Sequence, residues 1–365
     1  MHPKKIAFFL PSLAGGGAER VVLNLLKGMS AQGISLDLVV ATTEGPYLEQ
    51  VPEGVRVINL ATGRVILAVP ALSRYLKENR PIALIAHMNH ANVAAMLARD
   101  LAGTKTRLIL VEHSTLSVNK SKLLRNKLLP TMMRWLYPRA EVVVAVSRGV
   151  ADDLDDRLGF ESGTVRVVYN PVVDADLIAK AQISPDHAWF QPGSPPVFLG
   201  VGRFSAAKDF SNLINAFALV RQQKPARLII LGEGELRGEL EAAIERHGIT
   251  EDVSLPGFVQ NPYAYMYNAS AFVLSSRWEG LPTVLIEAMA CGCPVVATDC
   301  PSGPQEILAS GKYGILVPIE NSTALADAML QTLETPVSRD VLLERGMYFS
   351  HERAVAEYLE LCEYR

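Results

Sequence analysis

The sequence contains few cysteines, four among 365 residues, and no apolar run of 18 or more residues. Four cysteines are too few for a disulfide scaffold, so we expect a reducing, cytoplasmic setting. Without a long apolar run, no membrane-spanning helix is expected. Neither sign of charge is in excess, since 35 basic and 38 acidic residues give a net charge of −3. A nucleic-acid-binding protein is therefore not expected.

Apolar residues, by contrast, make up 49% of the chain, and its length suits two domains better than one. Short apolar runs alternate with helical patterns, which predicts parallel sheets with helical crossovers. Several runs are apolar on successive residues, as strands covered on both faces are. The predicted strands are 6–10, 36–41, 55–60, 82–86, 108–111, 142–146, 165–169, 197–201, 228–231, 253–255, 271–274, 294–297 and 315–317.

The alternation lapses after Asn170-Pro171, and the proline-rich segment 184–196 is typical of a linker. We therefore expect two Rossmann-like, doubly wound α/β domains that face a cleft. A final amphipathic helix is expected to return to the first domain and bury its apolar stripe there. The expected segments are a first domain over 1–170, a linker over 171–195, a second domain over 196–345 and the C-terminal helix within 346–365.

Ligands of open α/β sheets bind beyond the carboxyl ends of the strands, so the residues that follow each predicted strand are the candidates for a site. Gly15-Gly16-Gly17 follows the first strand and opens a helix, which suits close approach of an anion but equally a plain tight turn. The dinucleotide fingerprint G-x-G-x-x-G is missing, and Ala41 and Thr42 stand where an acidic residue should close the next strand. A dehydrogenase is therefore disfavoured.

Two cations follow the first strand of the second half. Gly202-Arg203-Phe204 comes directly after the strand, and Lys208 lies five residues beyond Arg203. A planar guanidinium together with an ammonium suits a diphosphate, although surface cations are more often simply solvated.

The segment 275–292 holds the strongest pattern. Pro282 is expected at the first helical position, so that the amide of Thr283 and the positive end of the helix dipole are available to a phosphate. Glu279 precedes this helix and Glu287 lies inside it. A separation of eight residues, roughly 12 Å along a helix, is too long for a shared-proton pair but suits two sugars on either side of a diphosphate.

Glu279 and Glu287 form the E-x7-E pattern of retaining glycosyltransferases of family 4, and the chain resembles that family along nearly its whole length. The resemblance implies the GT-B fold, and it is closest to bacterial enzymes that extend lipid-linked oligosaccharides with N-acetylhexosamine, α-1,4-N-acetylgalactosaminyltransferases among them. Further matching motifs are Gly15-Gly16-Gly17-Ala18-Glu19-Arg20, Glu112-His113-Ser114, Asn170-Pro171-Val172, Gly202-Arg203-Phe204, Gly232-Glu233-Gly234, Gly257-Phe258 and Tyr313-Gly314-Ile315-Leu316-Val317.

The resemblance implies a role for each matched position. Arg203 and Lys208 would hold the donor diphosphate, Glu287 the ribose, and Glu279 the transferred sugar. His113, which follows the strand 108–111, would approach the sugar near the reacting carbon; a lone histidine is otherwise more often structural. We expect it to orient a hydroxyl rather than act as a base, and we count Glu279, His113, Arg203 and Lys208 as the catalytic set. The other implied donor-binding residues are Gly16, Gly17, Gly257, Phe258, Gly280, Leu281, Pro282 and Thr283.

The implied chemistry retains the configuration at the anomeric carbon. The departing phosphate oxygen takes the proton of the acceptor hydroxyl, so the protein has to orient both sugars and stabilise the leaving diphosphate. We expect no cofactor and no metal, although Asp153-Leu154-Asp155 and Asp174-Ala175-Asp176 both spell D-x-D. The first triplet fits a solvated helix face and the second lies in the linker. Cys291-Gly292-Cys293 lacks partner ligands and fits core thiols.

The segment 119–139 is basic and contains no acidic residue. It predicts an amphipathic element, broken or kinked at Pro130, that lies on an anionic membrane at the cytoplasmic face of the inner membrane or grips a lipid-linked diphosphate acceptor. The alternative is a surface helix whose apolar side packs on its own domain. The candidate acceptor or membrane residues are Lys120, Lys122, Arg125, Lys127 and Arg134.

The sequence thus predicts a transferase that moves a hexose or N-acetylhexosamine from a nucleotide-diphosphate sugar, with UDP favoured, to a saccharide acceptor. The acceptor is expected to be linked to a polyprenyl diphosphate, in cell-surface glycan biosynthesis. Two alternatives stay open at this point. One is a non-catalytic nucleotide-sugar-binding partner in a polysaccharide assembly complex, and the other is a nucleotide-sugar epimerase with a similar fold.

Overall fold

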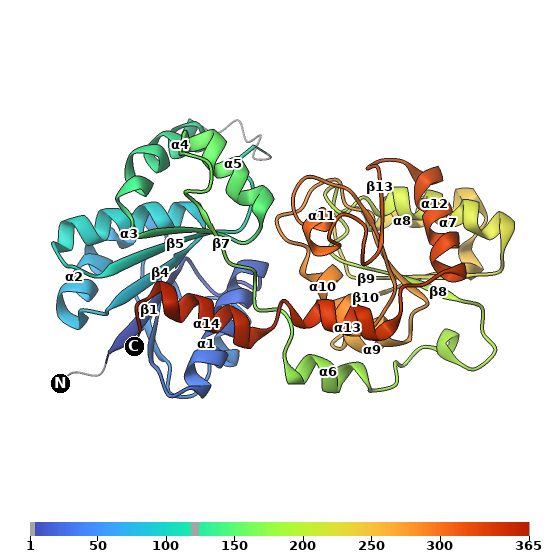
Figure 1. Ribbon diagram of the computed structural model, residues 1–365, viewed down its shortest axis with the longest axis horizontal. Coiled ribbons are helices and arrows are strands. Elements are labelled where there is room, and N and C mark those ends of the chain that lie inside the picture. The colour runs from blue at the N-terminus through green and yellow to red at the C-terminus, as the bar shows by residue number, and fades with distance from the viewer. Residues whose placement is uncertain (1–3, 118–123, 365) are drawn as a thin grey trace. The chain divides into compact units, whose positions relative to one another are not determined.

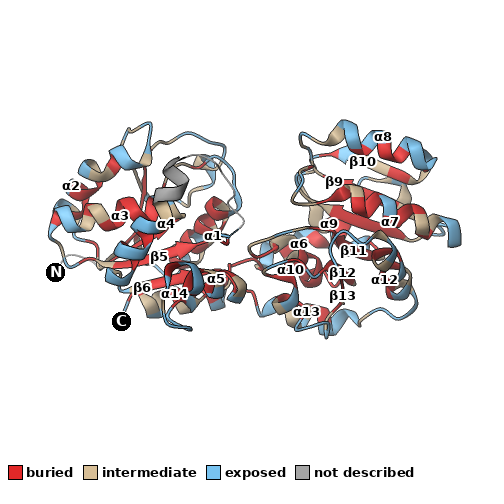
Figure 2. Ribbon diagram, turned by 90° about the horizontal axis from the view of Figure 1, so that it is seen from above, coloured by how far each residue is buried: buried red, intermediate tan, exposed pale blue. Residues whose placement is uncertain are grey.

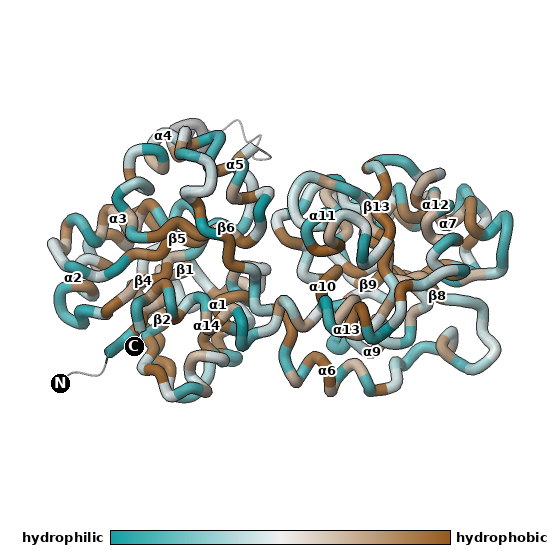
Figure 3. The backbone as a smooth tube through the Cα atoms, in the orientation of Figure 1, coloured by the Kyte–Doolittle hydropathy of each residue, from teal (hydrophilic) through white to brown (hydrophobic). Residues whose placement is uncertain are grey.

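The computed structural model describes residues 4–117 and 124–364 (Figure 1). The chain forms two units, one of Met1–Pro171 with His351–Arg365 and the other of Val172–Ser350. In each unit the buried residues concentrate in the strands and on the helix sides that face them (Figure 2). The apolar segments of the chain coincide with the same strands (Figure 3). Each unit is therefore a parallel sheet with a core on both of its faces.

The first unit is built on seven parallel strands in the order β3-β2-β1-β4-β5-β6-β7. Because β1 is flanked by β2 on one side and β4 on the other, the winding direction reverses between β1 and β4. The strands are β1 (Lys5–Leu10), β2 (Ser35–Val40), β3 (Arg56–Asn59), β4 (Ala83–His87), β5 (Arg107–Glu112), β6 (Val142–Ala145) and β7 (Arg166–Val167).

Helices connect these strands, as parallel pairing requires. The helices after β4 and β6 begin within three residues of the strand end, whereas longer loops follow β1, β3 and β5. The α-helices are α1 (Gly17–Ala31), α2 (Val69–Asn79), α3 (Asn89–Ala102), α4 (Leu124–Leu136), α5 (Arg148–Leu158) and α14 (His351–Leu361), and the 3₁₀ turns are η1 (Leu48–Gln50), η2 (Val65–Ala68) and η3 (Tyr137–Arg139).

The second unit repeats the plan with six parallel strands in the order β10-β9-β8-β11-β12-β13. Its winding direction reverses between β8 and β11. The strands are β8 (Val197–Val201), β9 (Arg227–Leu231), β10 (Val253–Gly257), β11 (Ala271–Leu274), β12 (Val295–Thr298) and β13 (Ile315–Val317). The helices are α6 (Ala175–Ala181), η4 (Ala188–Phe190), α7 (Phe210–Gln223), α8 (Arg237–His247), η5 (Thr250–Asp252), α9 (Pro262–Asn268), α10 (Thr283–Ala290), α11 (Pro304–Ile307), α12 (Ser322–Glu334) and α13 (Arg339–Met347).

The last helix, α14, belongs to the first unit, where it packs against α1. The contact is close, because a Cβ built on Gly28 of α1 would lie 2.6 Å from Cγ2 of Val355. The guanidinium of Arg107, at the start of β5, fastens the end of the helix. It donates to the carbonyl of Leu361 at 2.7 Å and lies 2.9 Å from the carboxylate of Glu363.

Three local predictions differ from the structure. The helix α4 continues through Pro130, so the predicted break does not occur, whereas the predicted kink stays a prediction. Pro282 caps α10 from outside, and the first helical residue is Thr283. The segment 171–195, for which the sequence predicts a linker, includes α6 and η4, and from Val172 onward it groups with the second unit. Within the described residues, no helix combines the length and apolar character needed to cross a bilayer.

Candidate active site

The predicted donor-binding residues of the second unit follow neighbouring strands on both sides of its switch point. The loop after β8 contains Arg203 and Lys208, and the loop after β11 contains Glu279. Because β8 and β11 are adjacent and parallel, their carboxyl ends place these two loops side by side. This edge of the sheet is where an open α/β sheet binds its ligand.

Lys208 and Glu279 form an ion pair between the two loops. The ammonium Nζ lies 2.6 Å from Oε1 of the carboxylate, and both side chains are largely buried, with 19% and 13% of their surface exposed. The hydroxyl of Ser276 donates to the same oxygen at 2.6 Å. One oxygen of Glu279 therefore accepts two hydrogen bonds, one of them charge-assisted.

Further hydrogen bonds fix the two loops to each other. The hydroxyl of Ser275 donates to the carbonyl of Lys208 at 2.7 Å, and the amide of Arg277 donates to the carbonyl of Ala207 at 2.8 Å. The guanidinium of Arg277 bonds the carboxylate of Asp209 at 2.8 Å, and Asp209 is the N-cap of α7. The position of Lys208 is thereby coupled to that of the segment after β11.

The Glu-Gly-Leu-Pro loop rests on the loop that follows β12. The hydroxyl of Ser302 donates to the carbonyl of Gly280 at 2.7 Å. Gly303 has a φ of +96°, and a Cβ at this position would lie 2.4 Å from Cδ of Pro282. Only glycine fits so close to the start of α10. Glu287, half-buried, lies one helical turn beyond Thr283 and on the same face of the helix.

Arg203 is held differently from Lys208. Its side chain is 76% exposed, and its guanidinium lies 3.2 Å from the carboxylate of Glu235. The backbone beneath it is tightly packed, because Gly232 has a φ of +133° and a Cβ there would lie 2.0 Å from the carbonyl oxygen of Gly202. Arg203 is thus on a rigid loop, but its side chain is free to turn toward a ligand.

A cavity of about 370 Å³ lies beside Arg203, over the ends of β8, β9 and β10. Phe258 is 81% exposed, although an apolar ring of this size is usually buried. Glu233, which sequence reasoning did not place in the site, also lines the cavity and pairs with Arg237 at 2.5 Å. The lining residues are Val201, Gly202, Arg203, Leu231, Gly232, Glu233, Phe258, Val259 and Pro262.

Gly16, Gly17 and His113 lie in the first unit, at the carboxyl edge of its sheet. Gly16 is the N-cap of α1 and Gly17 its first residue, as the glycine loop predicts. Nε2 of His113 lies 2.8 Å from Nδ1 of His87, the last residue of β4. Burial lowers the pKa of both imidazoles, that of His113 to about 4, so both rings are neutral at physiological pH.

His87 is the neighbour that sequence reasoning missed. It is fully buried, and its Nε2 has no hydrogen-bond partner among the described residues. Met88, which follows it, has a φ of +77°, an unusual conformation for a residue other than glycine. The position of His87 at the end of β4, next to the switch point of this sheet, could have indicated it as a site residue.

Glu112, the residue before His113, lies in a buried polar network. Its Oε1 accepts hydrogen bonds from the hydroxyl of Tyr137 and, at 2.9 Å, from the amide of Asn92. Burial raises the pKa of Glu112 to about 7, against the lowering effect of these two hydrogen bonds. The network fixes the end of β5 from which His113 projects.

The basic segment is partly outside the described residues. Lys120 and Lys122 lie outside them, and the side chains of Arg125 and Lys127 are not described either. Arg134 is exposed, and its guanidinium lies against Gly159. The apolar residues at the end of α4 divide between two faces: Met133 and Leu136 are buried, whereas Trp135 is 77% and Met132 38% exposed.

The two D-x-D triplets have structural roles. Asp174 caps α6 by accepting from the amide of Leu177 at 2.8 Å, and Asp153 accepts from the amide of Leu116. Among the described residues, no three histidine, cysteine or acidic side chains cluster as metal ligands would. Cys291 and Cys293 are buried.

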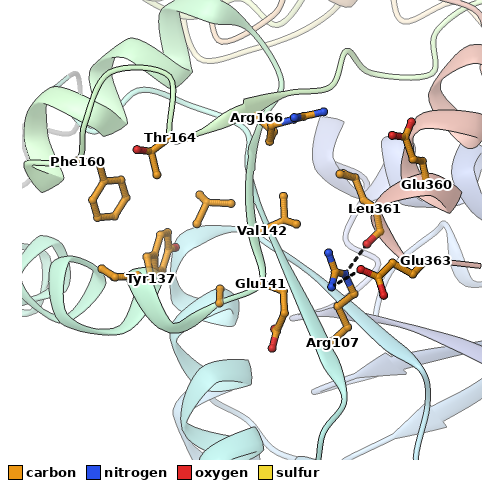
Figure 4. Close-up of a pocket in the computed structure, with 13 residues that line it drawn as sticks. Arg107, Tyr137, Glu141, Val142, Phe160, Thr164, Arg166, Glu360, Leu361 and Glu363 are labelled. Carbon is orange, nitrogen blue, oxygen red and sulfur yellow. Dashed lines mark hydrogen bonds and ion pairs between the residues drawn. The ribbon is translucent and has the colours of Figure 1, made fainter.

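A second cavity, of about 510 Å³, lies away from the predicted site residues (Figure 4). Its lining includes the first residues of β5, β6 and β7 and the end of α14. His113 follows the opposite end of β5, so this cavity is not the place where the predicted donor-binding residues meet. The labelled lining residues are Arg107, Tyr137, Glu141, Val142, Phe160, Thr164, Arg166, Glu360, Leu361 and Glu363.

Comparisons with known proteins agree with this architecture. Residues 15–176 match the family described as Glycosyltransferase Family 4, and residues 186–347 match Glycosyl transferases group 1. The chain is 33% identical over 354 residues to N-acetylgalactosamine-N,N'-diacetylbacillosaminyl-diphospho-undecaprenol 4-alpha-N-acetylgalactosaminyltransferase of Campylobacter jejuni, covering 93% of this chain and 92% of that one.

Two solved structures share the fold over almost the whole chain. The apo form of the lipopolysaccharide outer core galactosyltransferase WaaB has a TM-score of 0.77 and 23% identity, with 98% of both chains covered. Anabaena HepE in complex with UDP has a TM-score of 0.80 and 22% identity, with 99% of this chain and 100% of that chain covered. Two Rossmann-like units of this kind define the class of the protein, a glycosyltransferase with the GT-B fold. The chain belongs to glycosyltransferase family 4.

Proposed function

We propose that the protein transfers a hexose or N-acetylhexosamine from a UDP-sugar to a saccharide carried on a polyprenyl diphosphate, with retention of the anomeric configuration and without a metal ion. The observation that carries the proposal is the meeting of Lys208 and Glu279 next to the start of α10. The name of the Campylobacter relative supports a lipid-linked acceptor, and the UDP in the HepE structure supports the nucleotide.

The residues of the second unit suit a nucleoside diphosphate sugar. Lys208 and Arg203 supply two positive charges, and the amides at the start of α10 supply donors in the field of its dipole. Together they stabilise the charge that develops on the leaving diphosphate, which is the main task of such a site. Phe258 offers an exposed ring on which a base stacks.

The first unit would supply the group that orients the sugars. His113 is neutral, and His87 holds it at one ring nitrogen, so its other nitrogen is available to a hydroxyl. A neutral imidazole with a pKa of about 4 is a poor base at pH 7, which favours orientation over proton transfer. The departing phosphate oxygen then takes the proton of the acceptor.

We also propose peripheral contact with an anionic membrane at its cytoplasmic face, through the end of α4. Trp135 and Met132 are exposed next to the cationic Arg134. An exposed tryptophan beside basic residues is suited to the headgroup region of a bilayer. Trp135→Ala should lower binding to vesicles that contain phosphatidylglycerol, whereas activity on a short, soluble acceptor should stay unchanged.

The central experiment incubates the purified protein with a panel of UDP-sugars and a polyprenyl-diphosphate saccharide, in EDTA and in Mg²⁺. We expect a product one sugar heavier, α-linked from an α-linked donor, at similar rates in both buffers. An inverted anomer or strict dependence on Mg²⁺ would refute the mechanism. Epimerisation of the donor without acceptor would favour the epimerase, and donor binding without any turnover would favour the non-catalytic partner.

A further inference from the structure

Glu279 is fixed through only one of its two carboxylate oxygens. Oε1 accepts from Lys208 Nζ and from Ser276 Oγ, each at 2.6 Å. In the part of the chain that the structure describes, Oε2 has no hydrogen-bond partner. Because Oε1 is held in place, Oε2 has a defined position and can accept a hydrogen bond from a ligand.

Ser276 is itself fixed from the neighbouring strand. It is fully buried, and its carbonyl accepts a hydrogen bond from Oγ1 of Thr298 at 2.6 Å. The same hydroxyl reaches the carbonyl of Leu274 at 3.3 Å. Thr298 is the last residue of β12, which pairs with β11, so its side chain continues the link between the strands beyond the end of β11.

The demands on Lys208 change when a donor binds. Its ammonium is expected to turn at least partly toward the diphosphate, because a diphosphate carries more negative charge than the carboxylate of Glu279. Ser276 then becomes the main group that holds Oε1 of Glu279. Ser276 is fully buried, unlike the partly exposed Lys208, so a ligand in the site would not compete for its hydroxyl.

We propose that Ser276 is a positioning residue for the transfer reaction, supported by Thr298, which anchors Oε1 of Glu279 and leaves Oε2 to accept a hydroxyl of the transferred sugar. This inference rests on the proposed function of the same site. It assigns a task to two residues that touch neither sugar nor nucleotide. Their effect on the reaction is through the direction of one carboxylate.

The test compares Ser276→Ala and Thr298→Val with the wild type for kcat, KM of the donor, and affinity for UDP alone. Misplacing a group that orients the substrate costs about 10- to 100-fold in rate. We expect kcat to fall by about this factor in S276A and by about tenfold in T298V. Affinity for UDP, which lacks the sugar, should change less than twofold in both.

Two further variants make the comparison specific. Thr298→Ser keeps the hydroxyl and should restore at least half of the wild-type kcat. Thr332→Val is the matched control, because the hydroxyl of Thr332 is also buried and donates to a backbone carbonyl, that of Ala328 at 2.8 Å, but lies in α12 away from the site. It should have the kcat of the wild type.

The possible outcomes separate the inference from the proposed function. A wild type without transferase activity would refute the proposed function itself. An active wild type with S276A and T298V within twofold of its kcat would overturn the role of Ser276 alone. A parallel loss of UDP affinity and kcat would also overturn it, since the whole loop would then have moved. If S276A does not fold, T298V and T298S decide the question, because both leave the Ser276 side chain in place.

Discussion

The ammonium of Lys208 and the carboxylate of Glu279 lie 2.6 Å apart, although 71 residues separate them in the chain. They meet because β8 and β11 are neighbours in the sheet. Each residue neutralises the other. Under the proposed function, a phosphate and a sugar hydroxyl of the donor would replace part of this contact. The pair therefore keeps two charges ready in a largely buried place without leaving either unpaired.

Lys208→Ala should weaken binding of UDP at least tenfold, because one of two cations at the diphosphate is lost and Glu279 is left with an uncompensated charge. Isothermal titration with UDP measures this directly. Lys77→Ala is the control, since this lysine is exposed on α2 of the first unit. Unchanged UDP affinity in K208A would contradict the assignment of the diphosphate site.

Gly232→Ala should lower stability by about 2 kcal/mol and weaken UDP binding as well. The new Cβ would have to displace the carbonyl of Gly202, in a backbone conformation that alanine avoids. Gly238→Ala is the matched control: it lies in α8 with open space around it and should stabilise by about 0.5–1 kcal/mol. Urea titration and UDP binding of both variants test the prediction, and equal stability of the two would disprove it.

The free energy of unfolding of Glu112→Gln, relative to that of the wild type, should increase as the pH rises from 5 to 8. In the folded protein burial raises the pKa of Glu112 from its usual 4.5 to about 7, so the stability it contributes is complete below pH 4.5 and is lost as the pH rises through 7. A pKa difference of this size corresponds to a change in the free energy of unfolding on the order of 3 kcal/mol. Glutamine keeps the acceptor for Tyr137 and stays neutral.

Urea titrations of both proteins at pH 5 and pH 8 measure this change. The imidazoles of His87 and His113 have the opposite effect on the pH dependence of stability. Burial lowers their pKa values, so the stability that they contribute to the protein is lost as the pH falls below 6.5. The comparison with E112Q removes their contribution, since both proteins contain them. A stability difference that does not depend on pH would show that Glu112 is ionised in the folded state at pH 5.

The thiols should not react in the native protein. All four cysteines are buried, and burial raises their pKa values, those of Cys291, Cys300 and Cys362 to about 12. The thiolate is the reacting form, so Ellman's reagent should detect no fast thiol at pH 8. The same protein in guanidinium should show four, and a rapid native reaction would place at least one thiol on the surface.

Gly28→Ala should destabilise the first unit, and Val355→Ala should relieve that effect. The Cβ that alanine adds at position 28 would lie 2.6 Å from Cγ2 of Val355, a contact that removal of the valine methyl groups abolishes. In a double-mutant cycle we expect a favourable coupling of about 1 kcal/mol between the two changes. Additive effects would mean that α1 and α14 do not pack as described.

Much of the fold could be predicted because apolar runs mark buried parallel strands. All thirteen predicted strands correspond to strands in the structure, though 165–169 shortens to Arg166–Val167. The amphipathic pattern also predicted the C-terminal helix within 346–365, which is α14 (His351–Leu361). Strand order was beyond such reasoning, because it depends on pairing between distant segments and not on the residues of any one strand.

The loops that contain the site residues could be predicted from the sequence, but the contacts between those residues could not. The sequence indicated Lys208 and Glu279 separately, yet only the order of β8 and β11 brings them together. His87 was missed because its contact with His113 depends on the pairing of β4 with β5, which the residues of neither strand reveal. The break expected at Pro130 did not occur, because a proline inside a helix can kink it without ending it.

The attachment of α14 to the first unit has a consequence for biosynthesis. Residues 351–361 leave the ribosome only after the entire second unit, so the apolar side of α1 that they cover stays open during most of translation. The nascent first unit would thus expose an apolar surface on α1 during translation, and chaperones near the ribosome could bind it. Its assembly is completed last, although its strands are made first.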